Sequence, residues 1–148
     1  MIREMLSQLF ERDLTKLKAE IKAYTNESDL WKTADGISNS GGNLCLHLVG
    51  NMKHFIGKTL GNIPYERARE KEFSDKNIPI DVLEKSVDET LDGVLKTLNS
   101  LNDNELNNIY PINVFGKEMT TEWFLIHLYG HLNYHLGQIN YHRRLLNR

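Results

Sequence analysis

The last segment of the chain, Thr121–Leu146, reads TEWFLIHLYGHLNYHLGQINYHRRLL and holds four of the six histidines. His127, His131 and His135 recur at every fourth position, and His142 follows His135 by seven residues. At about 100° per residue, these four side chains fall within one helical sector roughly 80° wide. The segment therefore predicts a helix with one face lined by imidazoles, and the rest of the chain must pack against it.

Three further segments have apolar residues at the i, i+3, i+4, i+7 spacing of amphipathic helices. They are residues 2–24, residues 43–58, and the run from Pro79 to Leu101, where the proline suits a first helical turn. The candidate N-cap residues are Ser38, Ser40 and Asn43 for the second of these segments, and Thr120 or Thr121 for the last helix.

Each predicted helix has one apolar stripe to bury, and one core can bury all four stripes. The sequence therefore predicts an all-α fold, a four-helix bundle in a single domain over residues 1–148. The connection Thr59–Ile78 is about twenty residues long, enough to cross the length of a bundle. Its charged run, ERAREKEFSDKN, is interpreted as solvated surface with a possible helical turn around Glu66–Phe73. Residues 102–119 fit a short extended hairpin or an ordered loop.

Charge and composition exclude several classes of protein. The net charge is −2 and the Lys and Arg residues are scattered, so the sequence lacks the basic patch that nucleic-acid binding needs. No run approaches eighteen apolar residues, and charges interrupt the N-terminal segment, so neither a transmembrane helix nor a signal peptide is expected. The single cysteine fits a reducing compartment. We therefore expect a soluble, cytoplasmic protein.

His131 and His135 have the spacing at which two imidazoles on one helix converge on a metal ion. Position 132 is Leu rather than Glu, so the HExxH arrangement, which places a general base beside the first ligand, is absent. A metallopeptidase of that type is therefore disfavoured. The pair is a weak signal by itself, because a single histidine on an apolar face is more often a hydrogen-bonded core residue.

His47 strengthens the prediction of a metal site. It lies mid-helix in an apolar stripe, where burying an unpartnered imidazole would cost about 1–3 kcal/mol. A metal held jointly with His131 and His135 would supply the partner and leave coordination positions open to water or substrate. Cys45 lies about 200° around the helix from His47, so it is interpreted as a small buried hydrophobe instead of a ligand.

The remaining polar candidates have less direct roles. His127 is the next candidate, either as a ligand or as a hydrogen-bonding neighbour of one. Gln138 follows His135 by three residues and could donate or accept a hydrogen bond beside the ligands. His54 and His142 are interpreted as ordinary polar residues near the ends of the bundle.

The stretch SGGNLCLHLVGN, which contains His47, and the stretch HLNYHLGQ on the last helix together resemble the DinB/YfiT-like superfamily of metal-binding four-helix bundles. The resemblance spans nearly the whole chain. It implies helices in up-down-down-up order, with the long connection after the second helix as the crossover. It also implies a divalent ion, zinc or nickel, at His47, His131 and His135, and frequent homodimers.

Two functions follow as hypotheses. The resemblance implies a metal-dependent transferase in which the ion activates a low-molecular-weight thiol such as bacillithiol, mycothiol or glutathione, and the thiolate attacks an electrophile. Hydrolysis by a metal-activated water is the chemical variant. The alternative is a metal-binding or stress-response bundle that acts as a dimer without turnover. The sequence contains no recognisable thiol-binding motif that would decide between them.

Overall fold

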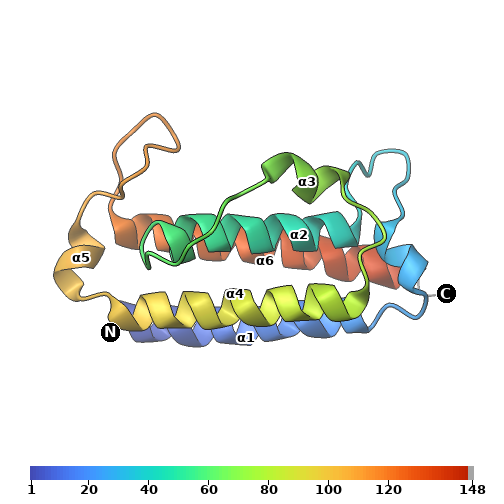
Figure 1. Cartoon of the computed structure of the whole chain (residues 1–148), viewed down its shortest axis with the longest axis horizontal. Coiled ribbons are helices and arrows are strands. Elements are labelled where there is room, and N and C mark those ends of the chain that lie inside the picture. Colours follow the sequence, from blue (N-terminus) through green and yellow to red (C-terminus); the bar gives the residue numbers. More distant parts are fainter. Residues whose placement is uncertain (147–148) are drawn as a thin grey trace.

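The computed structural model describes residues 1–146, in which helices and loops alternate and no strand occurs (Figure 1). The all-α prediction is thereby confirmed. The long helices are α1 (Ile2–Lys22), α2 (Gly41–Met52), α4 (Ile80–Ser100) and α6 (Thr121–Leu146). The short elements are the 3₁₀ helix η1 (Glu27–Trp31), the π-helix η2 (Lys53–Lys58), α3 (Arg69–Ser74) and α5 (Asp103–Asn107).

The four long helices lie lengthwise beside one another (Figure 1). Helix α1 contacts both α4 and α6, and α2 contacts α6 and α4 on the other side of the core. In Figure 1, α1 and α6 run in one direction while α2 and α4 run in the other. The segment between η2 and α4 returns along the length of the molecule and carries α3 over α2. This crossing places a charged segment directly above the helix that holds His47.

Apolar stripes at helical spacing explain why these segments are helical and how they pack. On α1 the buried stripe includes Phe10, Leu14 and Leu17, and the helix ends at Lys22, slightly earlier than predicted. Helix α2 is buried on almost every side, because α3, α4 and α6 all contact it. The core is one continuous cluster of buried apolar side chains contributed by all four long helices.

Capping residues define where α2 and α6 begin. Ser40 caps α2, since its Oγ accepts a hydrogen bond from the backbone N–H of Asn43 at 3.2 Å. Thr120 caps α6, since its Oγ1 accepts from the backbone N–H of Trp123 at 3.1 Å. Between α5 and α6 the chain forms an ordered loop closed by a single bridge from Ile109 to Thr120, and the alternative of an extended hairpin is wrong.

No helix within residues 1–146 combines the length and the hydropathy that crossing a bilayer would require.

Candidate metal centre

Three histidines meet where α2 packs against α6. His47 comes from α2, and His131 and His135 come from successive turns of α6. One ring nitrogen from each of the three lies within 4.8 Å of the others. The closest pair is Nε2 of His47 and Nε2 of His131, 3.1 Å apart. The structure therefore brings together the three residues that the sequence predicted, and this triad could hold a metal ion.

A buried carboxylate, that of Glu72, fixes the orientation of His47. Nδ1 of His47 lies 3.0 Å from Oε1 of Glu72, a residue of α3 that is only 5% exposed. Arg67 donates to the same carboxylate from Nε at 2.8 Å and from Nη2 at 2.9 Å. Burial alone would raise the pKa of Glu72, but the hydrogen bonds from His47 and Arg67 outweigh it and hold this pKa below its ordinary value.

The charge on Glu72 decides which nitrogen of His47 carries the proton. An ionised carboxylate only accepts hydrogen bonds, so Nδ1 of His47 must carry the proton. Nε2 then holds the lone pair, and this atom points at His131. A histidine whose outer nitrogen donates to a carboxylate is the usual arrangement of a metal-ligating histidine.

Glu72 is the site residue that the sequence interpretation missed. The run ERAREKEFSDKN was interpreted as solvated surface, which is wrong at this position. Asn43 anchors the run on α2, since its Nδ2 donates to the carbonyl oxygens of Glu72 at 3.0 Å and Asp75 at 2.9 Å. Phe73 packs its ring 4.9 Å from that of His47. An aromatic residue beside an acid within a charged run was the available signal that this segment packs against the bundle.

His135 has an equivalent partner on its own helix. Its Nδ1 lies 2.7 Å from Oε1 of Gln138, one turn further along α6. Because an amide oxygen only accepts, Nδ1 of His135 is the donor and Nε2 carries the lone pair. Burial, together with the nearby imidazole of His47, lowers the pKa of His135 even though Gln138 acts in the opposite direction. The ring is therefore neutral at pH 7, as a metal ligand must be.

The position of His131 is compatible with a bound cation. Burial, with further contributions from His135 and His47, lowers the pKa of His131 to about 4. Its Nδ1 is buried and has no hydrogen-bond partner among residues 1–146. Its Nε2 lies 3.1 Å from Nε2 of His47, a distance at which it donates a hydrogen bond if it carries the proton. Two imidazole nitrogens bound to one ion at about 2.0–2.1 Å would lie about 3.0–3.4 Å apart, which this separation matches.

The other three histidines lie outside this triad. His127, the next candidate in the sequence, stacks its ring on Trp123 and Phe124, with centroid separations of 5.8 and 5.7 Å. His54 lies in η2, where burial and then the charges of Arg67 and Lys58 lower its pKa.

His142 has both ring nitrogens occupied. Nε2 lies 2.8 Å from the carbonyl oxygen of Lys32, and Nδ1 lies 2.6 Å from the hydroxyl of Tyr24. Since the carbonyl accepts, Nε2 donates to it and Nδ1 accepts from Tyr24. His142 thus links α6 to the segment that follows α1, as a structural polar residue near the end of the helix.

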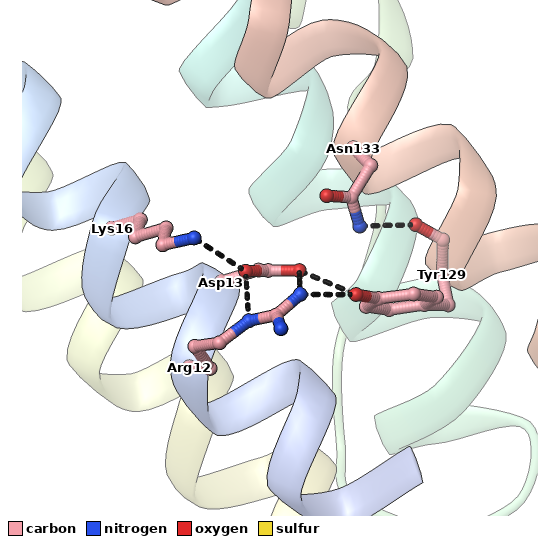
Figure 2. Close-up of polar contacts among 5 residues, drawn as sticks. All are labelled: Arg12, Asp13, Lys16, Tyr129 and Asn133. Atoms are coloured by element: carbon pink, nitrogen blue, oxygen red, sulfur yellow. Dashed lines mark hydrogen bonds and ion pairs between the residues drawn. The ribbon is translucent and has the colours of Figure 1, made fainter.

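A second buried carboxylate positions α6 against α1 (Figure 2). Asp13 is fully buried and lies between its neighbour Arg12 and the hydroxyl of Tyr129, which donates to Oδ2 at 2.6 Å. Arg12 contributes Nε at 2.8 Å and Nη2 at 3.0 Å. Burial opposes ionisation, but these hydrogen bonds outweigh it and lower the pKa of Asp13 to about 2. Tyr129 precedes His131 by two residues, so this contact fixes the helix that carries two of the three histidines.

Comparisons with known proteins relate this chain to one family of proteins. The family model described as the DinB family matches residues 21–146, a range that includes all three histidines. The chain is also similar to the crystal structure of a DinB-like protein from Bacillus cereus ATCC 10987. The two are 20% identical with a TM-score of 0.74, over 97% of this chain and 92% of that one. At this identity the likeness shows the fold. No curated protein matches the sequence.

Proposed function

The chain belongs to the DinB family, and from this premise we propose that it is a divalent-metal protein whose ion is held by His47, His131 and His135. The observation that carries the proposal is the convergence of three ring nitrogens within 4.8 Å. In His47 and His135, Nδ1 already donates a hydrogen bond, to Glu72 and Gln138 respectively. The donor set of three imidazoles suits zinc or nickel, which are the ions we propose.

We further propose that the site is catalytic, as a metal-dependent transferase acting with a low-molecular-weight thiol or as a related hydrolase. Three protein ligands leave coordination positions open, which is typical of catalytic sites. When bound, the ion would lower the pKa of a thiol or water at an open position. The role of the chain's own residues is to orient that centre. Glu72 and Gln138 hold the rings of His47 and His135, and the core around α2 excludes water from one side.

The fold and assembly expected for such a protein are part of the proposal. We propose a single-domain four-helix bundle in up-down-down-up order. Its support is the pairing of α1 with α4 and the long return segment between α2 and α4.

The charge of −2 supports a protein without nucleic-acid partners, and a cytoplasmic location without membrane contact is likewise an expectation.

A second function, a metal-binding or stress-response homodimer without turnover, has one observation in its favour. Helix α6 exposes large apolar side chains along its outer face, including Trp123, Ile126 and Tyr134. Large exposed apolar side chains on one face of a helix are common in protein interfaces. Such a dimer is compatible with the same metal site, so the two functions differ in turnover and not in ligands.

Metal analysis of the purified protein tests the site. Wild type should carry close to one equivalent of a divalent ion per chain, and His47→Ala, His131→Ala and His135→Ala should each lose most of it. His127→Ala is the matched control, because its ring lies on the same helix but packs against Trp123 and Phe124. Undiminished metal in all three ligand variants would refute the proposed site.

Turnover separates the two functions. The metal-loaded protein is incubated with thiols and electrophiles in pairs, and loss of free thiol is followed with and without a chelator. Thiol consumption that stops on chelation supports the transferase. Metal binding with a stable dimer and no metal-dependent loss of any thiol or electrophile favours the alternative.

A further inference from the structure

A cavity of about 420 Å³ opens beside His135. One wall is the C-terminal half of α6, including Tyr134, Gln138 and Tyr141. The opposite wall is formed by residues 36–39 and by Leu44 of α2. Because His135 contributes to the lining, a molecule in this cavity would lie next to the histidine triad.

The lining carries no fixed charge. Among residues 1–146 it includes no Asp, Glu, Lys or Arg, and its polar side chains are Ser38, Asn39, Gln138, two tyrosines and two histidines. Of the histidines, His142 already uses both ring nitrogens. One cation lies nearby, since the guanidinium of Arg144 sits 5.6 Å from the ring of Tyr141, but it does not line the cavity. Apart from an ion held by the histidine triad, an anionic ligand would therefore find no ionic partner in this lining.

Much of the aromatic and aliphatic surface of the lining is exposed to solvent. Tyr134 and Tyr141 are each 66% exposed, and they lie seven residues apart on one face of α6. Ile37 and Leu145 add exposed aliphatic surface. A smaller hollow of about 160 Å³ shares Ile37, His142 and Leu145 with the first one and continues the apolar surface to Leu146. Lys32 borders that hollow, but its ammonium pairs with Asp29 at 2.5 Å.

We propose that this cavity binds an uncharged small molecule with an aromatic or aliphatic body, which packs on Tyr134 and Tyr141 while its polar group faces His135. Rings of this kind gain most from flat apolar partners, and the amide and hydroxyl groups of the lining suit an uncharged polar end. Its role as the substrate's binding site rests on the proposed function, whereas binding itself does not. Glutathione, with its free carboxylates, is a poor occupant of this cavity.

Two isosteric probes test the proposal on the full chain. The uncharged probe is 4-ethylbenzamide and the charged one is 4-ethylbenzoate. Binding is followed by backbone amide NMR, with and without added zinc. The benzamide should give saturable shifts at residues 36–39 and 134–145. In the metal-free protein the benzoate should bind at least about tenfold more weakly. Because binding is measured in metal-free protein too, failure of the metal site and failure of the cavity give different results.

Variants locate the probe. Tyr134→Ala and Tyr141→Ala should each weaken benzamide binding by about two- to tenfold, while Trp123→Ala, an exposed aromatic elsewhere on α6, should leave it unchanged. Ser38→Lys, which adds a cation to the lining, should raise the affinity for the benzoate. Three outcomes would overturn the proposal: no saturable benzamide binding, shifts centred outside the cavity, or benzoate binding to the metal-free protein that is at least as tight as benzamide binding.

Discussion

Glu72 accepts a hydrogen bond from Nδ1 of His47 at 3.0 Å although 25 residues separate the two in sequence. This contact joins the return segment to α2, the helix that carries His47. Arg67 donates to both oxygens of this carboxylate, so Glu72 cannot move away without losing two charged hydrogen bonds. The orientation of one proposed ligand therefore depends on a segment that is far from it in the chain.

Replacing Glu72 should weaken metal binding. Glu72→Gln keeps the size of the side chain but removes the charge that holds the proton on Nδ1 of His47, and we expect about a ten- to hundredfold loss of metal affinity. Competition with a chromophoric chelator measures the change. Glu70→Gln, an exposed acid on the same short helix, serves as the control. Equal affinities for the two variants would mean that Glu72 does not position His47.

Gly50 offers a test that moves Glu72 without changing the chemistry of any polar group. A Cβ at this position would collide with the carboxylate of Glu72, so Gly50→Ala should displace Glu72 and weaken metal binding in the same direction as Glu72→Gln. Gly130→Ala is the control, because nothing lies within 4 Å of its added Cβ, and it should stabilise α6 by about 1 kcal/mol. Unchanged affinity in Gly50→Ala would show that Glu72 can move without consequence.

The local part of this structure was predictable from the sequence. Periodicity gave the four long helices, because the 3.6-residue repeat is a property of neighbouring residues. The histidine triad was also accessible, since His131 and His135 share a helix face and His47 interrupts an apolar stripe. Both signals can be detected within a single helix, and only their convergence needed the fold.

The missed features depend on how distant segments meet. Glu72 resembles the acids around it, and only the path of the return segment over α2 distinguishes it. The same holds for Asp13, which reaches Tyr129 across 116 residues. The π-helix over Lys53–Lys58 could not be foreseen either, because its residues have ordinary helical periodicity. Sequence patterns report which face is buried, but not which partner covers it.

Acid should remove a stabilising contribution made by Asp13. Its pKa is about 2 in the folded chain and 3.8 as a reference, so the folded state favours the ionised form. Because its pKa is lower in the folded chain, ionised Asp13 stabilises the folded state at pH values above its unfolded pKa. This contribution, about 2 kcal/mol, disappears as the pH falls from about 4 to 2. Asp13→Asn should lower the free energy of unfolding at pH 7, and its difference from wild type should shrink over that window.

Urea denaturation at a series of pH values measures this difference. Glu11→Gln, an exposed acid on the same helix, is the control and should differ little from wild type at any pH. A difference between Asp13→Asn and wild type that persists unchanged at pH 2 would show that the Asp13 charge is not the stabilising element.

The pair formed by Tyr24 and His142 provides a test of whether His142 is structural. The hydroxyl of Tyr24 donates to Nδ1 of His142 at 2.6 Å, and burial raises the pKa of Tyr24, which keeps this donor protonated. Tyr24→Phe leaves a buried imidazole nitrogen without its partner, so the free energy of unfolding should fall by about 1–3 kcal/mol. Because neither residue belongs to the triad, metal content should stay at the wild-type level. Urea denaturation and metal analysis on the same preparation measure both quantities, and metal loss from a still-folded variant would instead place His142 within the metal centre.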